Sequence, residues 1–150
     1  MPYYNSVEAL LSAAQSRTAS ILKKDVKPAA EKILTAHIKS DIYDAYSPKD
    51  GAWVNGSTYD RRNSLYNVKS KITDNVLFVT SDASPSKPIV KGYSIKNDGS
   101  GSFLKMLEVG NMGIWRSGFS RPAVSNAQRE VESSGEIKAA IKNGIKREFG

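Results

Sequence analysis

The first third of the chain shows a helical pattern of apolar residues between positions 6 and 46. These residues recur three or four positions apart, which places them on one face of a helix. Asn5 or Ser6 can cap the start. Pro28 interrupts the pattern, because it lacks a backbone N–H and disfavours helical geometry at the residue before it. We therefore expect either one kinked helix or two helices, the second capped by Asp25. The predicted stripe consists of Val7, Leu10, Leu11, Ala14, Ile21 and Leu22, followed by Val26, Ala30, Ile33, Leu34, His37, Ile38 and Ile42.

A β-hairpin is predicted for residues 65–81. Residues 68–72 read Val-Lys-Ser-Lys-Ile, an alternation that is typical of a strand with one face buried and its lysines in solvent. Residues 73–75, Thr-Asp-Asn, supply the turn. The run 76–80, Val-Leu-Phe-Val-Thr, is almost continuously apolar, so we expect it to be a central strand.

The second half of the chain begins with a long connection. Residues 82–102 contain prolines and glycines that argue against a core element. Residues 103–109 fit a strand or a short helix, and residues 110–121 are expected to be a loop. Pro122 begins the last helical region, which residues 133–135, Ser-Ser-Gly, can break. The apolar stripe of this region consists of Ala123, Val124, Ala127, Val131, Ile137, Ala140, Ile141 and Ile145.

This order of elements predicts an α+β fold. N-terminal helices and a C-terminal helix would pack on a small antiparallel β-sheet. The 150 residues suit a single domain over 1–150, with long loops at 47–64 and 82–102. With 39% hydrophobic residues the core is modest, so we expect part of the stability to come from assembly.

The charge of the chain restricts its partners. The formal net charge is +7, which favours attraction to an acidic protein surface, to nucleic acid or to an anionic membrane. The chain has no cysteine, which excludes disulfides and thiol chemistry. No apolar run approaches the roughly 20 residues of a membrane span, and we expect neither a signal peptide nor a membrane partner.

Few groups in the chain are suited to catalysis or metal binding. His37 is the sole histidine, and metal sites and acid–base pairs need partners at set spacings, so we interpret it as a packing or surface residue. Glu31, Asp41 and Asp44 are interpreted as solvated charges on a helix. No HExxH, GxSxG, Walker or Rossmann motif occurs. We therefore expect no enzymatic activity, no catalytic or metal-binding residues and no cofactor.

Aromatic residues and arginines gather in two loop-like segments, and Trp115 and Arg116 lie on a glycine-rich crossing. Tryptophan, tyrosine and arginine dominate protein interfaces. The same residues can stack on bases and pair with phosphates, or they can simply cover a sheet edge. We predict a protein interface and keep the other two interpretations open. The predicted interface residues are Trp53, Tyr59, Arg61, Arg62, Trp115, Arg116 and Arg121.

Four short motifs in a fixed order carry a resemblance to a known family. They are AYSP at 45–48, YDRRNSL at 59–65, LEVG at 107–110 and RPAV at 121–124. In this order the chain resembles the small tail-completion, or head–tail joining, proteins of long-tailed bacteriophages, from about residue 25 to the end. The 59–65 motif, the length of the 82–102 connection and Ala123 depart from the family pattern. These departures leave open whether the chain is a neck adaptor, a tail terminator or a minor virion component.

The resemblance implies a homo-oligomeric ring in the virion neck, assembled in the host cytoplasm. Its partners would be the head connector or adaptor proteins on one side and the tail terminator or tail tube protein on the other. DNA would pass through the channel. Trp115 and Arg116 would then be a docking anchor. The alternative is a phage accessory protein that binds nucleic acid.

Overall fold

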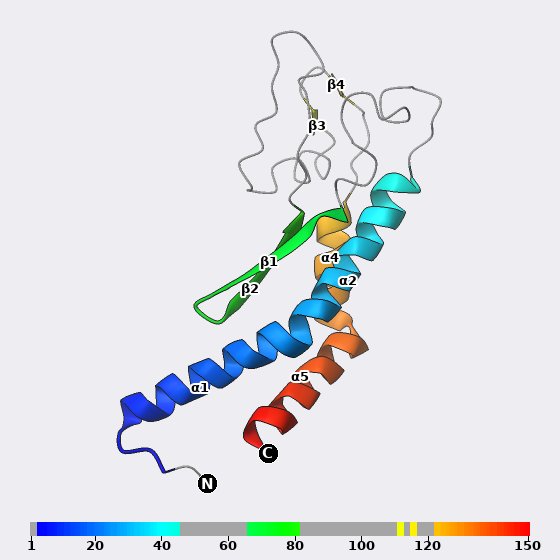
Figure 1. Cartoon of the computed structure of the whole chain (residues 1–150). Coiled ribbons are helices and arrows are strands. Elements are labelled where there is room, and N and C mark those ends of the chain that lie inside the picture. The colour runs from blue at the N-terminus through cyan, green and yellow to red at the C-terminus, as the bar shows by residue number, and fades with distance from the viewer. Residues whose placement is uncertain (1–2, 46–65, 82–110, 113–114, 117–121) are drawn as a thin grey trace.

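The computed structural model describes residues 3–45, 66–81, 111–112, 115–116 and 122–150. These residues form helices and small antiparallel sheets, which confirms the predicted α+β class (Figure 1). The predicted loops at 47–64 and 82–102 and the predicted element at 103–109 lie outside the described residues.

The N-terminal region forms one continuous helix that bends along its length (Figure 1). Ser6 caps its start by accepting a hydrogen bond from the N–H of Ala9 at 3.1 Å. Of the two predicted arrangements, the single kinked helix is the one that forms, because helical residues follow one another without a break. This helix ends at Tyr43, slightly before the predicted stop. Its segments are α1 (Val7–Ile21), the π-helical η1 (Leu22–Val26), α2 (Lys27–His37) and the π-helical η2 (Ile38–Tyr43).

Pro28 accounts for the first π-helical turn. It has no N–H to donate to the carbonyl of Lys24, and its ring would clash with that carbonyl in a regular α-helix. The helix widens instead, and the N–H of Lys27 donates to the carbonyl of Leu22, five residues earlier. The predicted capping role of Asp25 is wrong, because the helix runs straight through it and no side chain caps α2.

The predicted hairpin is confirmed as β1 (Val68–Thr73) paired with β2 (Val76–Ser81). Thr73 lies opposite Val76, so Asp74 and Asn75 form a two-residue turn, with φ of 51° and 59°. Both residues tolerate this left-handed geometry, which matches the twist of the strands. One face of the hairpin packs on α2, where the Ser70 hydroxyl donates to Glu31 Oε1 at 2.7 Å.

The expectation that 76–80 is a central strand is wrong for the described part of the chain. There β2 pairs with β1 alone. Val76 and Phe78 lie on the outer face and are 49% and 56% exposed, whereas Leu77 and Val79 pack against the core. This continuous apolar run therefore forms a strand with one buried face and one exposed face.

The C-terminal region forms α4 (Ala123–Ser133) and α5 (Gly135–Phe149). Pro122 precedes the first of these helices as predicted, and the predicted break falls at Ser134. The Ser134 hydroxyl caps α5 by accepting hydrogen bonds from the N–H groups of Glu136 and Ile137.

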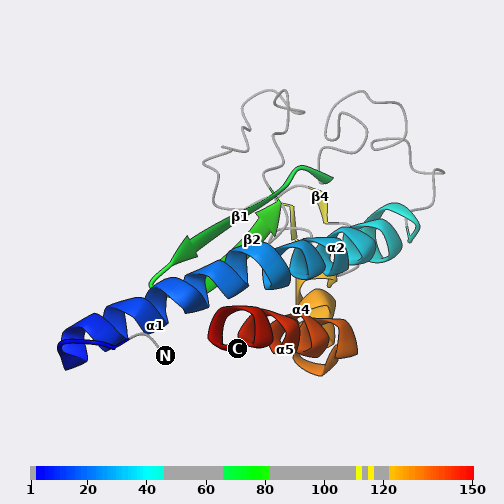
Figure 2. The ribbon, with the colours of Figure 1, turned by 60° about the horizontal axis from the view of Figure 1, so that its bottom comes forward.

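The long helix lies between the hairpin on one side and α4 with α5 on the other (Figure 2). The C-terminal helices pack chiefly on this helix, so the core has a helix at its centre. Most of the buried apolar residues come from the long helix for the same reason. They are Ile21, Val26, Ala29, Ala30, Ile33, Leu34, Ile38, Ile42, Ala123, Ala127 and Ile137.

Candidate functional site

The structure describes two of the predicted interface residues. Trp115 and Arg116 form the short strand β4 (Trp115–Arg116), which pairs antiparallel with β3 (Asn111–Met112). The expectation that 110–121 is a loop is therefore wrong at these four positions. The other predicted interface residues lie outside the described part of the chain: Trp53, Tyr59, Arg61, Arg62 and Arg121.

Tyr66 follows the predicted interface residues Tyr59, Arg61 and Arg62 in the sequence, and it packs within the fold. Its ring lies 5.0 Å from the ring of Tyr43 at the end of the long helix, in a tilted arrangement. This contact joins the start of the hairpin to η2 and packs against the core.

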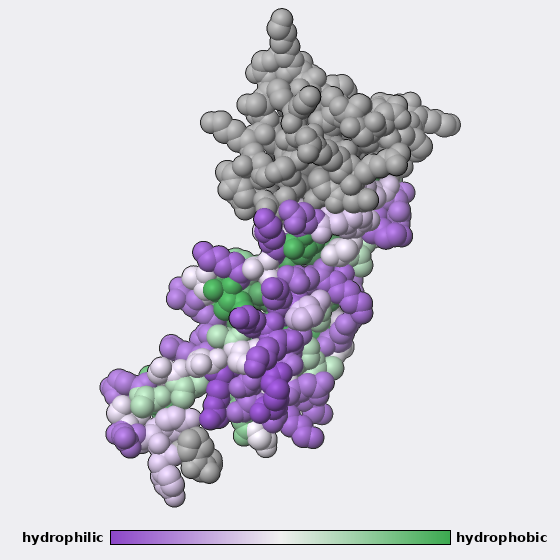
Figure 3. All heavy atoms as spheres, viewed as in Figure 1, coloured by the Kyte–Doolittle hydropathy of each residue, from purple (hydrophilic) through white to green (hydrophobic). Residues whose placement is uncertain are grey.

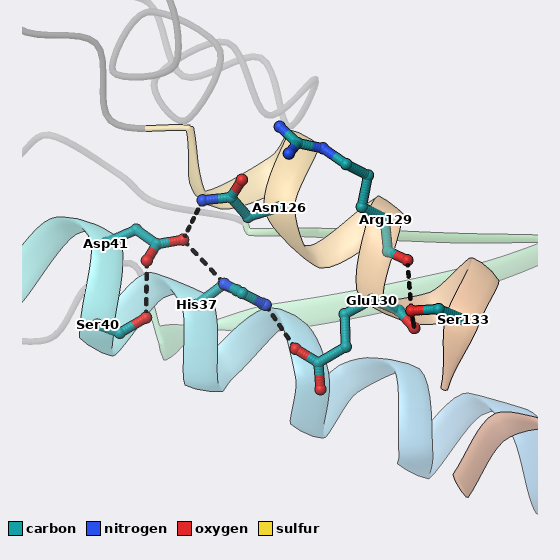
Figure 4. A network of polar contacts seen from close by, with 7 residues as sticks. All are labelled: His37, Ser40, Asp41, Asn126, Arg129, Glu130 and Ser133. Atoms are coloured by element: carbon teal, nitrogen blue, oxygen red, sulfur yellow. Dashed lines mark hydrogen bonds and ion pairs between the residues drawn. The ribbon is translucent and has the colours of Figure 1, made fainter. Parts of the chain in front are cut away.

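A polar cluster joins the long helix to α4 (Figure 4). His37 Nδ1 lies 2.8 Å from Asp41 Oδ2, and His37 Nε2 lies 2.6 Å from Glu130 Oε2. Asn126 Nδ2 donates to the same Asp41 oxygen at 3.0 Å, and the Ser40 hydroxyl donates to Asp41 Oδ1 at 2.8 Å. We call these five residues the His37 clamp, since His37 is held by carboxylates on two elements.

Both ring nitrogens of His37 face carboxylate oxygens, so the protonated imidazolium, which donates from both, is the form that satisfies the cluster. Burial alone would lower the pKa of His37. The hydrogen bonds and negative charges of Asp41 and Glu130 outweigh burial, and the pKa is raised. Burial would likewise raise the pKa of Asp41, but hydrogen bonds from Asn126, His37 and Ser40 lower it.

The interpretation of Asp41 as a solvated charge is therefore wrong, and that of Glu31 is incomplete, since Glu31 accepts from Ser70. Asp44 does form an exposed pair with Lys39 at 3.1 Å, as expected of a surface charge. The spacing of His37 and Asp41, one helical turn apart, was a usable signal for the clamp. Nothing in the sequence pointed to Glu130, which lies far along the chain.

The His37 clamp predicts a specific dependence of stability on pH. A folded pKa above the unfolded value of about 6.5 stabilises the protein fully below pH 6.5, and this contribution is lost as pH rises through the folded pKa. His37→Gln should lower the unfolding free energy by about 1–2 kcal/mol near pH 6, a modest loss because half-exposed Glu130 is screened by solvent. The loss should be smaller near pH 9, where His37 is neutral. Urea denaturation of both proteins across this range measures the difference. Equal losses at both pH values would contradict the charged clamp.

A second polar cluster joins η1 to α5. Arg147 Nη1 donates to both carboxylate oxygens of Asp25 at 2.7 Å, and Nη2 donates to Glu148 Oε1 at 2.8 Å. The Ser20 hydroxyl donates to the same Glu148 oxygen at 2.7 Å. Charge-assisted contacts of this kind fix the orientation of one helix against another. Asp25, which was predicted to cap a helix, instead binds Arg147.

Large apolar side chains remain uncovered on several surfaces, although they belong to stripes that predict a core. Figure 3 shows apolar surface over the hairpin and along α1, between broad polar areas. The first turns of α1 carry exposed Val7, Leu10 and Leu11, and α5 carries exposed Ile141, Ile145 and Phe149. Exposed apolar groups that form a contiguous patch are typical of surfaces that contact another molecule.

Within the described residues, no group of three or more histidine, aspartate or glutamate side chains could hold a metal ion. Both nitrogens of His37 are engaged by carboxylates, which leaves neither for a substrate. Among the helices described, none is long and apolar enough to cross a membrane.

The comparison with protein families supports a phage relationship. The chain matches the model of the YomN family over residues 6–147. No curated protein and no solved structure matches it. The phage relationship predicted from the four motifs is thereby confirmed, whereas membership of the tail-completion family stays a prediction. Since the match covers nearly the whole chain, the protein belongs to the YomN family, a phage-related family.

Proposed function

We propose that this protein is a structural virion component that forms a ring at the head–tail junction of a tailed phage and joins the connector to the tail. The observation that carries the proposal is the protruding start of α1, where the large apolar side chains of Val7, Leu10 and Leu11 are exposed. A domain with a modest core and uncovered apolar helices is suited to completion by neighbouring subunits. Membership of a phage-related family supports the same assignment.

Particles assembled without the protein test this function. Electron microscopy should show filled or leaking heads and separate tails, because the joining layer would be absent. Supplying the protein from a plasmid should restore joined particles. Intact, DNA-filled virions with normal tails in its absence would refute the proposal.

The predicted docking anchor on β4 gives a second test. Trp115→Ala with Arg116→Ala should leave the monomer folded and abolish head–tail joining, since tryptophan and arginine supply much of the energy of interfaces. Thermal melting and particle counts measure the two properties separately. Arg129→Ala, which removes a charge from an exposed position on α4, serves as the control, and its heads and tails should join normally. A stability loss of about 3 kcal/mol or more in the double variant would instead place Trp115 in a core.

The alternative function, nucleic-acid binding, is favoured by the net charge of +7 and by a row of exposed lysines on α5. It predicts affinity for duplex or single-stranded DNA that falls steeply with salt. Fluorescence anisotropy at low and physiological salt measures this affinity. Absence of binding at low salt would remove the alternative and leave the joining role in place.

A further inference from the structure

The helices α1 and α5 are both 15 residues long, but they are offset, so the first turns of α1 extend past α5. At its buried end, Ile21 lies directly against Gly144 of α5. Val7 lies about four helical turns before Ile21, so the two residues share a face. This face continues uncovered at the start of α1, where Val7, Leu10 and Leu11 are 68%, 49% and 57% exposed. In both ribbon views the first turns of α1 extend past the end of α5 (Figures 1 and 2).

The helix α5 carries a second apolar stripe that is only partly covered, chiefly at Phe149, where the Arg17 guanidinium of α1 lies 5.2 Å from the ring centroid. Ile141, Ile145 and Phe149 follow one another at intervals of four, and 40%, 49% and 49% of each residue is exposed. The next ridge around α5 is a row of exposed lysines, at positions 138, 142 and 146. None of these lysines forms an ion pair with another described residue.

The two stripes are complementary in length and in charge. Val7 to Ala14 spans about 10 Å along a helix, and Ile141 to Phe149 spans about 12 Å. Between Val7 and Ser16 the sole charged residue is Glu8, which is exposed beside the apolar stripe. A helix with one negative charge can therefore lie along a stripe that is bordered by positive charges.

We infer that the first half of α1 in one copy of this chain docks on the Ile141–Ile145–Phe149 stripe of the next copy. Glu8 faces the lysine row in this arrangement. The contact joins two different surfaces, so it is head-to-tail and can be repeated around an axis until a ring closes. The inference rests on the proposed ring function, and it names the surfaces by which the ring forms.

The absence of cysteine from the chain makes a disulfide test specific. Leu11→Cys and Ile145→Cys variants, one of them tagged, are mixed as full-length proteins and oxidised with oxidised glutathione. The mixed disulfide should form in large excess over either homodimer, because only the mixture brings the two thiols together. Replacing Leu11→Cys by Ser16→Cys, which places the thiol on the opposite side of α1, should reduce the mixed product to background.

Two results would overturn the inference. A homodimer of Leu11→Cys as abundant as the mixed product would show that α1 pairs with α1. A mixed product no greater than that of the Ser16→Cys control would show that the stripes do not meet. Circular dichroism checks that each variant is folded, which is expected because all three positions are exposed.

Charge variants test the orientation. Glu8→Lys in the Leu11→Cys partner should lower the yield of mixed disulfide several-fold at low salt, and Lys142→Glu in the other partner should restore it. An unchanged yield would contradict the placement of Glu8 against the lysine row. A mixed disulfide with normal virions in the protein's absence would keep the contact and refute the neck role. Separated heads and tails without a mixed disulfide would support the neck role and refute this contact.

Discussion

Replacing Ile38 with alanine should lower the unfolding free energy by about 3–4 kcal/mol, the largest effect expected of a single substitution here. The Ile38 side chain is fully buried in η2, where the long helix meets α4. Truncation removes apolar contacts and leaves a cavity that tightly packed neighbours fill only in part. Urea denaturation monitored by circular dichroism measures the change.

The matched control is Ile141→Ala, which makes the same chemical change on exposed α5. We expect a loss below about 1 kcal/mol at protein concentrations low enough to prevent association. Equal losses in the two variants would contradict the assignment of Ile38 to the core and of Ile141 to the surface.

Gly144→Leu should be the second strongest perturbation, with a loss of about 2–3 kcal/mol. A Cβ at this position would lie 2.6 Å from Ile21 Cγ2 and 2.9 Å from Asp25 Oδ2. The Cγ2 methyl of Ile21 cannot easily move away, because a β-branched side chain is restricted at χ1. A shift of Asp25 would disturb its contacts with Arg147. Leucine favours helix more than glycine does, so a loss would report the forced separation of α1 and α5. Thermal and chemical denaturation measure it.

Gly144→Ala adds only a Cβ at the same position and is the smallest form of the Gly144→Leu change. Its control is Gly135→Ala. No atom lies within 4 Å of a Cβ added at Gly135, so alanine there should leave stability unchanged or raise it by up to about 1 kcal/mol. Gly144→Ala should instead destabilise the protein. A gain at both glycines would show that α1 and α5 are not in close contact.

Local patterns predicted local structure well. The alternation at 68–72 and the Asp74–Asn75 turn correctly indicated the hairpin, because strand period and turn chemistry depend on neighbours in sequence. Ser6 was among the expected caps, and Ser134 lies where the helix break was expected. These features need no knowledge of distant residues.

Features that depend on distant partners were not predictable. The exposure of Phe78 follows from β2 having one covered face, and a run of apolar residues contains no information about how many faces are covered. Val7 and Leu11 continue a core stripe in sequence, yet α5 ends before it reaches them. Asp25 has the right residue type for a cap, and its partner Arg147 lies at the other end of the chain.

The interface predicted from aromatic and basic residues stays a prediction, because most of its residues lie outside the described part of the chain. The surfaces of α1 and α5 that the structure leaves exposed lie elsewhere, and no interface was predicted there. These surfaces are aliphatic apart from Phe149, and the sequence pattern assigned their leucines and isoleucines to the core. A stripe that extends past the helix covering it can be recognised only when the packed helices are seen together.

The central claim is that this protein is a ring subunit between head and tail. Cryo-electron microscopy of the head–tail junction of virions that encode it tests this claim most directly. We predict several copies of the bent helix, the hairpin and the α4–α5 pair, repeated around the DNA channel between connector and tail. Absence of the protein from purified virions, or its presence as single copies away from the channel axis, would contradict the claim.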